Sequence, residues 1–150
     1  MPKPSNPEKW EYMFSDDMTF SQKIVISNPE LVNRFLILKR SSISTNPGLW
    51  DLPGGNVLYG ELHQDSLARE LLEETGLTDI QELKPAIVNT RYIPEKMLYR
   101  LYIGYKAKTL GTKIILSSEH DDFQWVTLEE VLNMPAKDML KEMTRQSLIN

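Results

Sequence analysis

The sequence predicts one α/β domain, in which strands flank a central helix and shorter helices follow at the carboxyl end. Its 150 residues are enough for one domain with a hydrophobic core and too few for two. Residues 65–75 have the apolar period of a helix, whereas the long apolar segments before and after them are typical of strands. A last amphipathic segment follows Pro135. This order of elements is typical of a layered sheet-and-helix fold.

An arm, two strands and a loop precede the central helix. Residues 19–27 and 32–39 are predicted strands, and the turn signal at 28–30 joins them into a hairpin. Residues 41–49 form a loop, and about residues 1–18 form a Pro-rich N-terminal arm. Three aromatic residues of this arm alternate with polar ones, so the arm could pair with a sheet edge or cover the core: Trp10, Tyr12 and Phe14.

We expect Gln64 or Asp65 to cap the start of the central helix and a left-handed Gly76 to cap its end. The remaining elements follow this helix. The apolar patterns predict two long strands joined by a turn, two short strands, a short helix and a last amphipathic helix. In order, these are 80–92, 97–108, 113–116, 123–126, 128–133 and a helix with Ala136, Met139, Leu140 and Met143 on one face.

The composition excludes several classes of function. A net charge of −4 and a pI near 5.2 argue against an extended nucleic-acid surface. The chain has no cysteine, which excludes disulfides, thiolate zinc sites and a cysteine nucleophile. No run of 18 apolar residues predicts a membrane span, and the N-terminus lacks the apolar region of a secretory signal. We therefore expect a cytoplasmic protein.

The central helix carries Glu70, Glu73 and Glu74 on one face. The other side, which we expect to pack against the core, carries Leu67, Ala68, Leu71 and Leu72. Glu70 and Glu74 are a like-charge pair four residues apart, which costs a few tenths of a kcal/mol. Glu73 and Glu74 also place negative charge in the last turn, where the helix dipole disfavours it. A divalent cation such as Mg²⁺, which prefers oxygen ligands, would relieve both effects. A merely solvated acidic face is the alternative interpretation of these glutamates alone.

The spacing around these glutamates is more specific. Five residues separate Gly55 from Glu61, and seven more precede the run Arg-Glu-Leu-Leu-Glu-Glu-Thr-Gly-Leu at 69–77. This pattern resembles the Nudix box at every fixed position. Residues 50–54 and 123–126 also resemble segments that usually flank it. The chain is therefore identified by resemblance as a member of the Nudix hydrolase family.

The resemblance implies a fold, a reaction and a set of roles. The fold is an αβα sandwich around a mixed sheet, with the box as a loop–helix–loop. The reaction is Mg²⁺-dependent hydrolysis of the diphosphate bond in a nucleoside diphosphate linked to another group, and Mn²⁺ could replace Mg²⁺. Glu70, Glu74 and the carbonyl of Gly55 are implied metal ligands, and Glu73 is a further ligand or the base. Arg69 would position a box glutamate, and Glu61 would support the site, either by ligating through water or by bracing the loop.

Residues outside the box are less strongly indicated. Some relatives use an acidic residue in a late loop as the base, which points to Glu119 here. Arg40 could reach a substrate phosphate. His63 and His120 lack the spacing of a metal site, so we expect surface histidines. Four aromatic residues that could stack on a base are expected to pack in the core: Trp50, Tyr92, Tyr99 and Tyr102.

The alternatives differ in what they require of the sequence. A non-catalytic Nudix module for ligand binding or sensing typically lacks box glutamates, and none is lost here. Isomerases of isopentenyl diphosphate on this fold rely on a cysteine, which the chain lacks. Among substrates we favour a nucleoside triphosphate, oxidised or not, because the chain is short. Dinucleoside polyphosphates, ADP-ribose, nucleotide sugars and capped RNA stay open, as does a homodimer.

Overall fold

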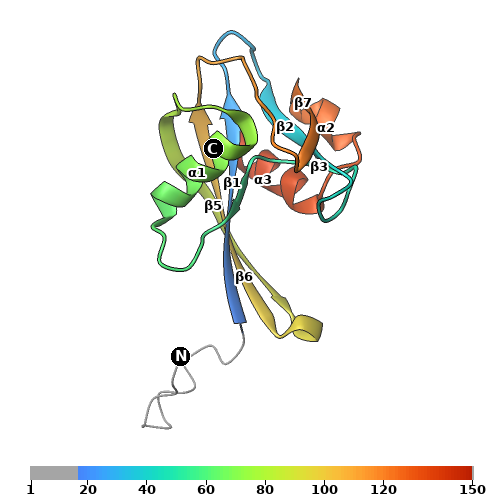
Figure 1. The fold of residues 1–150 in the computed structure, drawn as a ribbon. Helices are drawn as coiled ribbons and strands as arrows, with labels where there is room; N and C mark the ends of the chain where they lie inside the picture. Colours follow the sequence, from blue (N-terminus) through green and yellow to red (C-terminus); the bar gives the residue numbers. More distant parts are fainter. Residues whose placement is uncertain (1–16, 150) are drawn as a thin grey trace.

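A computed structural model of the chain describes residues 17–149. It has a seven-stranded mixed sheet with helices on both faces, which confirms the predicted α/β class (Figure 1). Along the chain the elements are β1 (Asp17–Ser27), β2 (Phe35–Arg40), β3 (Trp50–Asp51), β4 (Gly54–Asn56), α1 (His63–Thr75), β5 (Gln81–Ile93), the 3₁₀ turn η2 (Pro94–Lys96), β6 (Leu98–Lys108), β7 (His120–Val126), α2 (Leu128–Leu132) and α3 (Asp138–Ile149).

Strand β1 is the centre of the sheet, whose main order is β3-β2-β1-β6-β5. It pairs in parallel with β6 over its whole length, from Asp17 opposite Leu98 to Ser27 opposite Lys108. It is antiparallel to β2 and to β4, and β7 pairs with β2 on the other side. The sheet is therefore mixed, as predicted. Figure 1 shows the first part of β1 and the β5–β6 hairpin projecting from the body.

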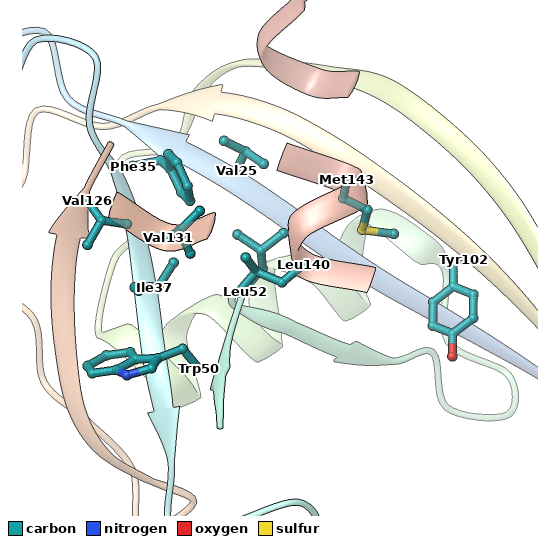
Figure 2. Packing of buried hydrophobic residues seen from close by; sticks show 10 residues of the cluster. All are labelled: Val25, Phe35, Ile37, Trp50, Leu52, Tyr102, Val126, Val131, Leu140 and Met143. Atoms are coloured by element: carbon teal, nitrogen blue, oxygen red, sulfur yellow. The ribbon is translucent and has the colours of Figure 1, made fainter. Parts of the chain in front are cut away.

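Alternation along β1 and β2 divides the core between the two faces of the sheet. Val25, Phe35 and Ile37 face α2 and α3 in one buried cluster, which also contains Leu140 and Met143 (Figure 2). On the other face, α1 contributes its two buried leucines to a second cluster: Ile24, Ile26, Leu36, Leu38, Leu67, Leu71, Leu77, Tyr105 and Ala107. The central strands are thus buried on both faces, which explains their nearly continuous apolar runs.

Several predicted boundaries were wrong for local reasons. Residues 32–34 are a turn with Asn33 at φ 59°, so the second strand begins only at Phe35. Residues 113–116 do not form a strand; Ile115 N–H instead donates to the carbonyl of Thr75 at 2.9 Å. Ala68 and Leu72, expected to pack, are exposed.

Of the two predicted caps of α1, one was wrong and the other is confirmed. The predicted cap at Gln64 or Asp65 was wrong, because the helix begins at His63 and its N-cap, Leu62, makes no side-chain cap bond. The predicted cap at Gly76 is confirmed by its φ of 74° and its N–H bond to the Leu72 carbonyl at 3.0 Å. The aromatic residues of the N-terminal arm lie outside the described residues. Across 17–149, no helix is long and apolar enough to span a membrane.

Leu36→Ala is expected to lower the free energy of unfolding by about 2–5 kcal/mol, because Leu36 is fully buried on the face of the sheet that α1 covers. Urea unfolding followed by circular dichroism measures the change. Leu110→Ala is the matched control, since Leu110 is exposed. Equal losses in the two variants would contradict this division of the core.

Candidate metal and diphosphate site

The three box glutamates of helix α1 differ sharply in solvent exposure. Glu74 is only 4% exposed, and the Glu70 side chain is largely buried. Glu73 has 56% of its side chain in solvent. The shared helical face that the sequence predicts therefore runs from a buried carboxylate to an open one.

The carboxylate of Glu74 is buried with few partners. Its Oε2 accepts a hydrogen bond from the backbone N–H of Gly54 at 3.0 Å. Burial raises the pKa of Glu74 to about 8, although the Lys23 ammonium and the Gly54 N–H act in the opposite direction. Burial also raises the pKa of Glu70. A cation between these groups would stabilise their ionised forms, which burial disfavours.

Two glycines let strand β4 approach α1 and β1 closely. Gly54 has φ 133°, and a Cβ there would overlap the backbone carbonyl of Gln22. A Cβ on Gly55 would lie 2.5 Å from the carboxyl group of Glu70. The backbone of Gly55 therefore lies against the Glu70 carboxylate, and any side chain at position 55 would collide with that carboxylate.

Arg69 ties the acidic groups of the box together. Its guanidinium binds both oxygens of Glu61, from Nε to Oε2 at 2.8 Å and from Nη2 to Oε1 at 3.0 Å. Nη1 also donates to Glu70 at 3.1 Å and to Glu73 at 3.3 Å. The hydrogen bond from Arg69 lowers the pKa of Glu61 to about 2. Glu61 further accepts from the N–H of Leu58 at 3.1 Å, which anchors the loop.

The start of β7 brings two more groups to Glu74. Glu119 and His120 each place a ligand atom within 4.8 Å of the other and of a Glu74 oxygen. Glu119 is exposed, whereas His120 is only 6% exposed, so the prediction of a surface histidine was wrong there. Burial, together with Lys23 and Arg40, lowers the pKa of His120 to about 4. His63 is exposed, as predicted.

Beside these acids lies the buried carboxylate of Asp51, which is in contact with three cationic side chains. This cluster was not predicted from the sequence. Asp51 contacts Lys23 at 3.1 Å, Arg40 at 3.4 Å and Lys137 at 3.4 Å. Burial acts to raise the pKa of Asp51, but Lys23 and Lys137 hold it below its ordinary value. Arg40 also donates to Thr45, so its predicted contact with a substrate phosphate stays a prediction.

A cavity of about 410 Å³ opens next to this cluster, between the sheet and α3. Four cationic side chains line it: Lys23, Arg91, Arg100 and Lys137. Arg91 and Arg100 are direct cross-strand neighbours on β5 and β6. Tyr102, Met139 and Met143 supply apolar wall. The volume lies in the range of small-ligand sites.

The aromatic residues divide between the core and the projecting hairpin. Trp50 and Tyr102 are buried, as predicted. Tyr92 is exposed and stacks on Tyr99 with ring centroids 4.5 Å apart, so core packing was wrong for Tyr92. Neither Tyr92 nor Tyr99 lines the cavity.

Comparison with known protein families identifies the family of this chain. The family model for the NUDIX domain matches residues 20–146. The chain belongs to the Nudix family. This membership covers the box helix, the sheet and α3, and thus all parts of the site described above.

Individual relatives agree with this Nudix assignment. The nucleoside triphosphatase NudI of Salmonella paratyphi B is 31% identical over 93 residues, which cover 57% of this chain and 66% of that protein, just under two thirds of it. The crystal structure of the MutT protein from Methanosarcina mazei Go1 has a TM-score of 0.72 and 29% identity, covering 91% of this chain and 97% of the other. The E. coli ORF135 protein shares the fold, with a TM-score of 0.74 at 20% identity over 91% of this chain and 93% of that one.

The residues present fit a divalent cation. The carboxylates of Glu70 and Glu74 offer oxygen donors, the ligands that Mg²⁺ and Mn²⁺ prefer. Glu74 supplies the decisive observation, because its carboxylate is buried beside a single backbone donor and a partly buried Glu70. Glu119 and His120 complete a group that could hold a metal ion.

Arg69→Lys is expected to weaken binding of Mn²⁺ about 10- to 100-fold, because an ammonium cannot hold both oxygens of Glu61 and also reach Glu70. Isothermal titration calorimetry measures the affinity. Arg34→Lys is the matched control, since Arg34 forms an ion pair with exposed Glu130 of α2. Unchanged Mn²⁺ affinity in Arg69→Lys would show that the guanidinium does not position the ligands.

Proposed function

We propose that this Nudix chain is a pyrophosphohydrolase that uses Mg²⁺ to cleave the diphosphate bond of a nucleoside diphosphate linked to another group. The observation that carries the proposal is that the carboxyl groups of Glu70 and Glu74 lie against two consecutive residues, Gly55 and Gly54. A diphosphate repels nucleophiles with its own negative charge. A site for its hydrolysis must therefore combine a cation, a place for the phosphates and a group that accepts a proton.

Glu70, Glu74 and the carbonyl of Gly55 would hold the Mg²⁺ ion, and Mn²⁺ could replace it. When bound, the ion would neutralise phosphate oxygens and make a water molecule more acidic. Arg69 fixes the Glu70 carboxylate on one side and Glu61 on the other. Glu61 in turn anchors the loop through Leu58. These two residues are positioning groups, because they act through the ligands.

Two carboxylates are placed to accept the proton of the attacking water. Glu73 is largely exposed and has an Arg69 contact at 3.3 Å. Glu119 is exposed immediately before β7, close to Glu74. The charges of both act on Glu70, a proposed ligand, so either carboxylate could reach a water molecule on the ion. The substrate assay below includes variants of both.

The adjoining cavity supports a nucleotide as the substrate. Apolar walls at Tyr102, Met139 and Met143 suit a nucleobase, and the cationic rim suits phosphate oxygens. We favour a nucleoside triphosphate, in agreement with the 31% identity to the NudI triphosphatase. We also expect a cytoplasmic enzyme without an extended nucleic-acid surface, given the acidic pI near 5.2.

The decisive assay is a substrate panel, with release of phosphate or diphosphate measured with and without Mg²⁺. It covers nucleoside triphosphates (oxidised ones included), dinucleoside polyphosphates, ADP-ribose, nucleotide sugars and capped RNA. We expect metal-dependent turnover of one class, with nucleoside triphosphates the first candidate. Glu74→Gln should lower kcat by about 10²- to 10⁴-fold, and so should Gln at whichever of Glu73 and Glu119 is the base.

Glu129→Gln is the matched control, because Glu129 is an exposed glutamate of α2. It should keep the turnover of the unmodified chain. No turnover of any compound with Mg²⁺ or Mn²⁺, in folded protein, would contradict the proposal and favour the binding-module alternative. Turnover that survives Glu74→Gln unchanged would contradict the role of that carboxylate.

A further inference from the structure

His120 is a buried imidazole with an uncommitted nitrogen. It is the first residue of β7 and is only 6% exposed. Within residues 17–149, its Nδ1 atom has no hydrogen-bond partner. Buried polar atoms are nearly always paired in native proteins, and an unpaired one needs a specific explanation. A bound ligand is one such explanation.

Two carboxylates lie within reach of this imidazole. Ligand atoms of Glu74, Glu119 and His120 are all within 4.8 Å of one another. Glu74 comes from the last turn of α1, and the backbone around Glu119 is held by the bond from Ser41 N–H to the Glu119 carbonyl at 2.9 Å. One divalent ion can bridge atoms at this spacing, since its bonds to nitrogen and oxygen are about 2.0–2.3 Å long.

The charges around His120 are compatible with binding of a further cation. Lys23 and Arg40 are the cations that act on the imidazole, and Asp51 and Asp121 are the acids. Both cations contact the carboxylate of Asp51, so their charge is partly neutralised. Glu74 remains a buried carboxylate with only the Gly54 N–H as a hydrogen-bond donor within the described chain.

We infer that Glu74, Glu119 and His120 form a mixed oxygen and nitrogen site for a divalent transition-metal ion. The inference deepens the proposed function and rests on it, because Glu74 belongs to both ligand sets. Mg²⁺ prefers oxygen ligands alone, whereas an imidazole nitrogen favours transition metals over Mg²⁺. The chain therefore binds Mn²⁺ more tightly than Mg²⁺ through His120. With Glu119 as a ligand, Glu73 is left as the proton acceptor.

Pulsed electron paramagnetic resonance of bound Mn²⁺ tests the inference on the untagged, full-length chain. Nitrogen nuclei bonded to Mn²⁺ modulate the electron spin echo, and labelling only histidine with ¹⁵N changes the frequencies that histidine causes. We expect a modulation that shifts on labelling. Bound Mn²⁺ without any histidine-dependent modulation would overturn the inference. This readout needs no turnover, so it fails or succeeds independently of the hydrolysis assay.

A pair of histidine variants identifies the residue. His120→Gln should abolish the modulation and weaken Mn²⁺ binding at least about tenfold, with a much smaller change for Mg²⁺. His63→Gln is the matched control, because His63 is the chain's other histidine and is exposed. Equal losses of Mn²⁺ and Mg²⁺ affinity in His120→Gln would indicate a structural role and overturn the inference. If that variant does not fold, the labelled unmodified chain still decides.

Discussion

The buried carboxylate of Glu74 is the constraint on which the site depends. A charge removed from water is costly unless it is paired, and Glu74 has one backbone donor and the nearby charge of Lys23 to offset burial. The other acids cannot supply the balance, because Glu70 and Glu119 add negative charge beside it. A cation is the natural complement of such an arrangement. Folding therefore buries a carboxylate whose charged form is under-compensated, and a bound cation would stabilise it.

The sheet determines where that position lies. Strand β1 is buried on both faces and pairs with β4 through Lys23 opposite Gly54 and Gln22 opposite Gly55. This register places the two glycines under the end of α1 and directs Lys23 toward Asp51. The same strand borders the cavity below α3 through Lys23. The Gly54–Gly55 segment, the Asp51 cluster and the cavity therefore all adjoin β1, a strand that is paired along both edges.

Much of the box was predictable because its spacing is local. Glu70, Glu73 and Glu74 share one helical face by geometry, and Gly76 follows the helix where a left-handed cap is expected. The partners of Asp51 were not predictable, because Lys23, Arg40 and Lys137 meet only through sheet register and the docking of α3. His120 was misassigned for the same reason, since nothing near it in the sequence indicates that Glu74 lies beside it. Residues 113–116 show the reverse error, an apolar run that packs against the core without pairing as a strand.

A crystal structure of the chain with Mn²⁺, in which anomalous scattering locates the ion, tests the central claim most directly. The account predicts an anomalous peak within bonding distance of a Glu74 oxygen, about 2.0–2.3 Å. It also predicts an ordered Glu74 carboxylate that faces the ion rather than solvent. Mn²⁺ bound only at other carboxylates, with Glu74 buried and uncontacted, would contradict the claim that this carboxylate holds the metal.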